Sequence, residues 1–229
     1  MGHTRVMDLQ SILKGNLLSD YAKQLLVSMA AVYPANIEQR HFEDMYFTHR
    51  QGLEELLEHS LLTIENEKIS ISDDIYNQVV DLMDMSYQAV DIAFNGRIAD
   101  SFYVDPQQDN SHLLTLVPAA QALLQRYELA DINIFTLANN LANFCYATGA
   151  LDQALEARRQ CQRLTENFDG FQFMHKVSDL YNLYQILLAL GEKEEARSSL
   201  IKAMDILKAE NQTQSNEFAT LKENLQALA

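Results

Sequence analysis

The side chains that could hold a metal ion gather in one short stretch near the N-terminus. They are two histidines and two carboxylates, His41, Glu43, Asp44 and His49. His41 and His49 are eight residues apart, which puts both on one side of an uninterrupted helix, but no further ligand is spaced to close a tetrahedral site. We therefore expect these residues to face solvent, and we predict that the chain binds no metal or other cofactor.

Catalytic chemistry is not indicated by the other polar residues. Most acidic pairs are adjacent in sequence, as at Glu194-Glu195, where a predicted helix begins and a negative charge suits the helix dipole. Ser, His and Asp occur without a nucleophile-elbow signature. The cysteines, Cys145 and Cys161, lack CxxC spacing and are expected to be small buried residues. We predict that this chain is not an enzyme.

Amide and aromatic side chains in the second half of the chain are better candidates for a binding site. Asn can donate and accept hydrogen bonds at once, so a row of them suits the backbone of an extended peptide. The predicted protein- or peptide-binding residues are Asn139, Asn140, Asn143, Tyr181, Asn182 and Gln185. A structural role within the fold is the alternative for Asn140 and Asn182. Exposure to solvent is the alternative for Asn139, Asn143 and Gln185.

These candidates lie in a segment that repeats at a fixed interval. TLANNLANF at residues 136–144 returns 42 residues later as SDLYNLYQI at 178–186, and a partial third copy, TLKENLQAL, follows at 220–228. A period of this length predicts stacked helical hairpins, each burying its apolar face against the next. The expected helices span residues 132–148, 151–166, 177–190 and 193–209.

Two kinds of small residue mark the same places in both copies. Gly149 and Gly191 follow the first helix of each hairpin, where a left-handed residue is cheap. Ala154 and Ala196 come early in the second helix and allow close packing. The pattern resembles the tetratricopeptide repeat family, in its 42-residue form found in kinesin light chains and signalling NTPases. In that family the inner face of the first helix lines a groove, which implies that the six candidates lie there.

Residues 1–95 have a different pattern. We expect helices at 7–15, 19–32, 38–47, 51–59 and 73–94. Between the last two, apolar residues alternate with polar ones around Asn66-Glu67, which predicts a hairpin with one buried face. Its apolar residues are Leu62, Ile64, Ile69 and Ile71. Helices, a hairpin and a further helix form the order of a winged-helix domain.

Charge argues against nucleic acid as a partner. The chain carries a formal net charge of −15, and residues 1–95 hold 6 basic against 15 acidic residues. The expected recognition helix carries Glu54, Glu55 and Glu58 against one arginine. Such a surface repels the phosphates that it would have to contact.

A second resemblance covers about residues 7–95. LLVSMAAVYPANIEQRHFEDMY, followed by GLEELLEHSLLTIENEKISIS, is similar to the winged-helix domain of NB-ARC and related STAND signalling NTPases, which implies an NTPase domain in cis as a partner. Ser72 stands where many members have a phosphate-contacting His, and no GxxxxGK[ST] stretch is present. The chain is therefore either a piece of a larger protein or a degenerate standalone relative.

The expected organisation is mostly α-helical. A winged-helix-like domain spans 1–95, a linker 96–110 and tetratricopeptide-like repeats 111–229, starting with a helix at 111–127 that Pro118 begins or kinks. No apolar run reaches membrane-spanning length and residues 1–15 lack a signal-peptide core, so we expect a cytoplasmic protein without a membrane partner.

The leading functional hypothesis is a non-catalytic sensor or interaction segment of a STAND-type signalling protein. Under this hypothesis the helical repeats bind a protein or peptide. The alternatives are a standalone peptide-binding adaptor and a peptide-responsive transcription regulator whose winged helix touches DNA.

Overall fold

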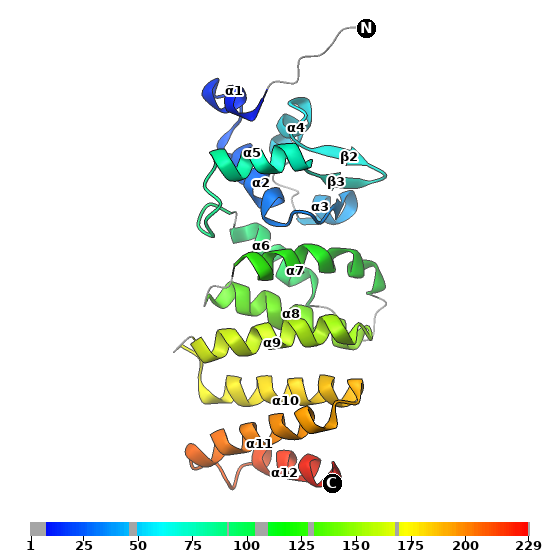
Figure 1. Ribbon diagram of the computed structural model, residues 1–229, viewed down its shortest axis with the longest axis vertical. Helices are drawn as coiled ribbons and strands as arrows, with labels where there is room; N and C mark the ends of the chain where they lie inside the picture. Colours follow the sequence, from blue (N-terminus) through cyan, green and yellow to red (C-terminus); the bar gives the residue numbers. More distant parts are fainter. Residues whose placement is uncertain are drawn as a thin grey trace. The chain divides into compact units, whose positions relative to one another are not determined.

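The structure is a computed structural model that describes residues 8–45, 50–90, 92–103, 110–127, 131–167 and 170–228. It is mostly helical and contains one small antiparallel sheet, which confirms the predicted fold class at that level (Figure 1). The chain forms two compact units. The first comprises residues 1–101 and 112–127, and the second comprises 102–111 and 128–229.

The first unit is a set of short helices with a sheet inserted between them. Its elements are α1 (Leu9–Lys14), α2 (Asp20–Ala31), β1 (Ile37–Glu38), α3 (Gln39–Met45), α4 (Arg50–Glu58), β2 (Thr63–Glu65), β3 (Lys68–Ser70), α5 (Asp73–Leu82), α6 (Ile92–Ser101), most of the 3-10 helix η1 (Ser111–Leu116), and α7 (Val117–Arg126). Ser19 starts α2 as predicted, because its Oγ accepts a hydrogen bond from Ala22 N at 3.2 Å. Pro118 lies in the first turn of α7, so it begins this helix and does not kink it.

The predicted hairpin is present and belongs to a three-stranded antiparallel sheet of order β1-β3-β2. Asn66 and Glu67 both have positive φ angles, 50° and 61°, as a tight hairpin turn requires. Ile64 lies opposite Ile69, but Ile64 is exposed whereas Ile69 is buried. The expected buried face is therefore wrong at Ile64. Strand β1 has only two residues and was not predicted.

The predicted helix at 73–94 is wrong, because α5 ends at Leu82. Met83 has an extended backbone, and Asp84 then holds a turn by accepting hydrogen bonds from Ser86 N and Ser86 Oγ. A new helix, α6, begins at Ile92 and runs to Ser101. The first six residues of the expected linker 96–110 are therefore helical, and residues 104–109 lie outside the described part of the chain.

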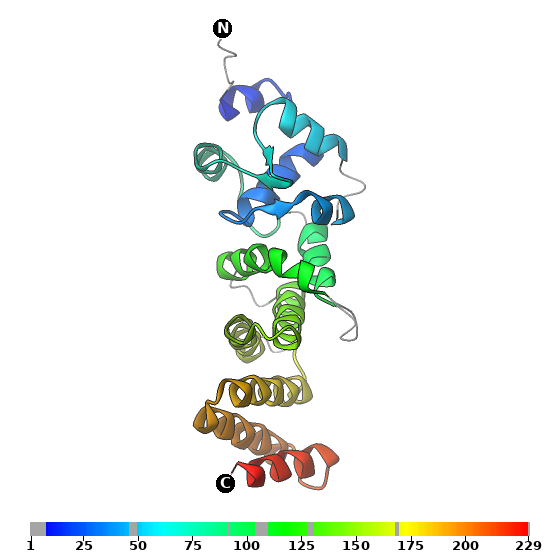
Figure 2. The same cartoon turned by 90° about the vertical axis from the view of Figure 1, so that its right-hand side faces the viewer.

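The second unit is a succession of long helices in which each packs on the next. They are α8 (Ile132–Ala147), α9 (Leu151–Asn167), α10 (Phe173–Leu190), α11 (Lys193–Ala209) and α12 (Asn216–Ala227). Figure 1 and Figure 2 show this succession in two views. The four expected helices agree with α8 to α11 except that α10 begins four residues early. Ala154 and Ala196 are fully buried, as close packing of the hairpins predicts.

The turns that end α8 and α10 are alike, and they explain the repeated glycines. Gly149 and Gly191 have φ angles of 79° and 83°, in the left-handed region. After α8, Ala150 N donates to Cys145 O at 2.8 Å; after α10, Glu192 N donates to Leu187 O at 2.9 Å. Both turns therefore satisfy carbonyls that the helix leaves free. The 42-residue repeat of the sequence is thus a repeat of local structure.

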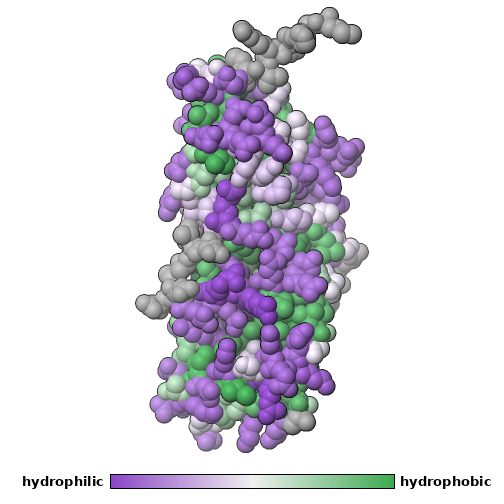
Figure 3. Space-filling view, viewed as in Figure 1, coloured by the Kyte–Doolittle hydropathy of each residue, from purple (hydrophilic) through white to green (hydrophobic). Residues whose placement is uncertain are grey.

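The surface agrees with the acidic composition. Hydrophilic side chains, coloured purple, predominate on the face shown in Figure 3, with hydrophobic areas between them. Among the described residues, none of the helices combines the length and the apolar character that crossing a bilayer requires.

Candidate functional site

A buried arginine at the centre of the second unit organises the candidate site. Arg158 lies in α9 among the buried residues Ala154, Ala157 and Cys161, and only 1% of it is exposed. Burying a guanidinium is costly unless it is paired and hydrogen-bonded. Its partners therefore decide whether this part of the fold is stable.

Arg158 binds side chains of the helices before and after its own. Its Nη1 donates to Asp179 Oδ1 of α10 at 2.7 Å and to Asn139 Oδ1 of α8 at 2.9 Å. Its Nη2 donates to Asn143 Oδ1 of α8 at 2.6 Å. One side chain thus joins α8, α9 and α10. Asn139 is half-buried, and Asn143 is exposed.

This network fixes the orientation of both amides. A guanidinium has only donors, so Asn139 and Asn143 must turn their oxygens toward Arg158 and their Nδ2 groups away from it. Neither Nδ2 group donates a hydrogen bond within the described residues. The two residues are four apart on one face of α8, so the face presents a row of N–H donors and not amides of mixed character.

Asp179 balances the charge of Arg158 but is itself strained by burial. Only 3% of Asp179 is exposed, and this burial raises the pKa of its carboxyl, an effect that the Arg158 guanidinium opposes. Within the described residues, Asp179 Oδ2 and Arg158 Nε have no hydrogen-bond partner. The ion pair leaves the site close to neutral despite the acidity of the chain.

The other predicted binding residues lie in different surroundings. Asn140 is buried, at 9% exposed, which favours a structural role for it. Tyr181, Asn182 and Gln185 of α10 are half-buried. Their relative in the third copy, Asn224, donates to Thr220 O of its own helix at 3.0 Å. The structure therefore brings Asn139 and Asn143 together through Arg158, and it adds Asp179, which the sequence did not indicate.

A pocket lies beside this face, between α10 and α12. Its volume is about 220 Å³, and it is lined mainly by apolar side chains, including Tyr181. Tyr181 and Asn139 hold corresponding places in consecutive repeats, 42 residues apart. The pocket therefore continues the face on which the Asn139 and Asn143 amides lie.

A second pocket, of about 320 Å³, lies between α9, α10 and α11 and includes Asp179. Its rim mixes both signs of charge, with Lys176 and Lys202 beside Glu166 and Asp205. Asp205 is engaged by Lys208 at 2.8 Å. This mixture indicates no class of ligand, so we centre the candidate site on α8, α10 and α12.

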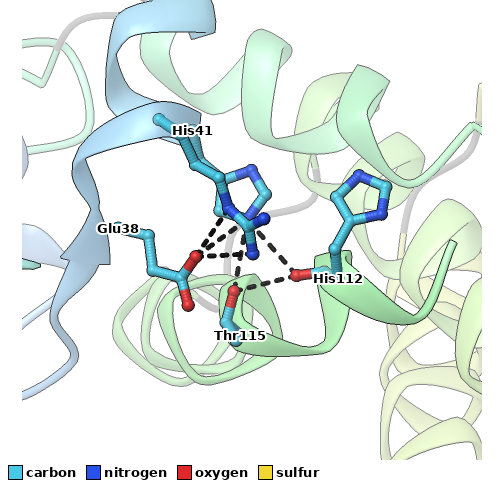
Figure 4. Close-up of polar contacts among 5 residues, drawn as sticks. Glu38, His41, His112 and Thr115 are labelled. Carbon is cyan, nitrogen blue, oxygen red and sulfur yellow. Dashed lines mark hydrogen bonds and ion pairs between the residues drawn. The ribbon is translucent and has the colours of Figure 1, made fainter. Parts of the chain in front are cut away.

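The expectation that His41 faces solvent is wrong. Its side chain is 5% exposed, and Nε2 lies 3.2 Å from Thr115 Oγ1 and 3.3 Å from His112 O, as Figure 4 shows. Burial lowers its pKa from the usual 6.5. Glu43 is exposed as expected, while His49 and the side chain of Asp44 lie outside the described residues. The described part of the chain contains no cluster of His, Cys, Asp and Glu that could hold a metal ion.

Other residues singled out by the sequence have structural roles. Cys145 and Cys161 are fully buried, as predicted, and burial raises the pKa of the Cys145 thiol to about 12. Burial likewise raises the pKa of Cys161. Neither thiol is a nucleophile at neutral pH. Ser72 starts α5, because its Oγ accepts a hydrogen bond from Ile75 N at 3.3 Å.

No protein-family model matches this sequence, and no curated protein or solved structure is significantly similar to it.

Arg158 and Asp179 were missed because each looks like an ordinary surface charge in the sequence. One signal could have found Arg158. It stands four residues after Ala154 and three before Cys161, so it shares the helical period of small residues that face the neighbouring helices. A lone charge on such a stripe indicates a buried partner on a neighbouring helix.

Proposed function

We propose that this chain is a non-catalytic interaction segment of a STAND-type signalling protein and binds an extended protein or peptide segment along α8, α10 and α12. The observation that carries the binding role is the Arg158 network, which turns the Nδ2 groups of Asn139 and Asn143 away from the interior. Under this proposal α8 to α12 are tetratricopeptide-like repeats. An NTPase domain in cis is the expected neighbour.

The spacing of the donors fits a peptide backbone. Four residues of an α-helix advance about 6 Å along its axis. Carbonyls that point the same way along an extended chain are two residues apart, which is about 6.6 Å. Asn139 and Asn143 therefore can donate to alternate carbonyls of one strand. This recognises backbone and leaves the peptide side chains to provide specificity.

Charge favours a neutral acceptor over an anionic one. Arg158 is neutralised by Asp179, so the amides have no unbalanced cation behind them. The chain as a whole carries −15, which repels a carboxylate or a phosphate on approach. Backbone carbonyls offer the same acceptor geometry without that repulsion.

The test separates donor loss from damage to the fold. In the Asn139→Asp/Asn143→Asp variant both residues still accept hydrogen bonds from Arg158, but both lose their N–H donors. A decapeptide is selected against the wild-type chain from a random phage-displayed library, and its affinity is measured by calorimetry. We expect the variant to keep its melting temperature and to bind the peptide roughly tenfold or more weakly, since two net hydrogen bonds are lost.

Gln153→Glu/Gln212→Glu is the matched control, because it adds two negative charges at exposed amides elsewhere in the second unit. We expect this control to bind as the wild type does. Equal affinity for the Asp variant and the wild type, or failure to select any peptide, would refute the proposed function.

The structure favours this function over DNA binding by the first unit. The order α2, β1, α3, α4, β2, β3 supports a winged-helix arrangement, in which α4 would be the recognition helix. Arg50 on α4, however, is paired with Glu54 of the same helix at 3.1 Å. Glu58 is exposed as well. A helix with this charge opposes phosphate contact.

A further inference from the structure

We infer that the pocket between α10 and α12 selects an apolar side chain of the bound peptide that is followed or preceded by a lysine or arginine. This inference rests on the proposed function and names its specificity. Met174, Val177 and Tyr181 of α10 and Leu221 of α12 supply the apolar wall. Glu217 of α12 stands at the same pocket.

The size of the pocket indicates a side chain and not a separate small molecule. Its volume of about 220 Å³ is below the roughly 300–1,000 Å³ of typical small-molecule sites. An apolar cavity of about 150 Å³ is enough to hold benzene. The pocket therefore has room for one leucine, isoleucine, methionine or phenylalanine side chain.

The position of the pocket indicates that its occupant belongs to the same peptide. Tyr181 corresponds to Asn139 across one 42-residue repeat, and Thr220, on the α12 side of the pocket, corresponds to Ser178 on its α10 side. The pocket thus lies between equivalent faces of consecutive repeats. A strand that donates carbonyls to the α8 amides and continues along this face reaches it.

Charge supports a basic neighbour for the apolar residue. Glu217 is exposed and forms no ion pair within the described residues. A carboxylate at the mouth of an apolar pocket on an acidic chain attracts a cation and rejects an acidic residue. The peptide class is therefore apolar with an adjacent positive charge.

The experiment uses the full chain and the decapeptide selected for it, with each peptide position replaced in turn by Ala, Leu, Phe, Lys and Glu. We expect one position to lose roughly tenfold in affinity with Ala and to accept Leu or Phe. A neighbouring position should prefer Lys to Glu. A peptide that lacks any such apolar position would overturn the inference.

Variants place this preference at the pocket. Ser178→Leu fills it from the α10 side and should abolish the apolar preference, whereas Ala189→Leu, exposed on the same helix, should not. Glu217→Gln should reduce the preference for Lys over Glu, while Glu223→Gln, with the same charge change on α12, should leave it. Melting temperatures verify that each variant is folded.

The outcomes distinguish the two proposals. If no peptide is selected, both the proposed function and the pocket inference fail. If a peptide binds through Asn139 and Asn143 but Ser178→Leu leaves its residue preferences unchanged, only the pocket inference fails.

Discussion

Arg158 Nη1 and Asp179 Oδ1 lie 2.7 Å apart, although the two side chains are among the least exposed charged groups of the second unit. This ion pair joins α9 to α10, and the same guanidinium holds two amides of α8. Stability and the candidate binding face therefore depend on one residue.

Arg158→Met should strongly destabilise the fold. The substitution leaves the Asp179 carboxylate buried without its counter-ion, which costs about 3–5 kcal/mol. Chemical denaturation measures the change. Arg159→Met is the control, since Arg159 pairs with Glu195 at 2.9 Å but both side chains are about half exposed. That loss should stay below about 1 kcal/mol, and equal losses for the two variants would contradict the role of the buried pair.

Gly191→Ala and Gly96→Ala should change stability in opposite directions. An added Cβ meets nothing within 4 Å at either site. Gly191 has a φ of 83°, where a side chain costs about 1–2 kcal/mol, whereas Gly96 lies inside α6, where alanine gains about 0.5–1 kcal/mol. Urea denaturation of both variants tests this, and a stabilised Gly191→Ala would show that the left-handed turn is not required.

Ala154→Leu and Ala196→Leu should each lower stability by about 1–3 kcal/mol. Both alanines are fully buried, so three added carbon atoms must displace the neighbouring helix. The exposed Ala189→Leu serves as the control in thermal melts. Buried and exposed variants that melt together would mean that the close helix packing is misplaced.

The stability of the first unit should fall on mild acidification because of His41. Burial holds its pKa below the usual 6.5. As the pH falls through about 6.5, the unfolded chain takes up a proton that folded His41 does not, so stability present above this pH is lost as the pH approaches the lowered pKa. Denaturation at pH 7, 6 and 5 should show a smaller loss for His41→Gln than for the wild type. An unchanged pH dependence would exclude His41 as its source.

The features that the sequence predicted well are encoded locally. Gly149 and Gly191 mark left-handed turns, and Asn66-Glu67 marks a tight hairpin, because each conformation depends on the residues at that point. The repeat interval could be seen because equivalent positions meet equivalent surroundings.

The features that were missed depend on contacts between distant residues. Strand β1 exists because Ile37 pairs with Ile69, 32 residues away. The end of α5 at Leu82 could not be predicted from an apolar pattern that continues past it. In the candidate site, the two asparagines were found by type, but the direction of their amides is set by Arg158 on another helix.

The immobilised amides have a thermodynamic consequence. A rotamer-rich side chain that becomes ordered when a partner docks loses entropy worth about 0.5–1.5 kcal/mol. Asn139 and Asn143 are already held by Arg158 before any partner arrives. Their ordering therefore belongs to the folding of α8 and α9. The face is preorganised, and a peptide that docks on these amides meets donors that need not lose rotational freedom again.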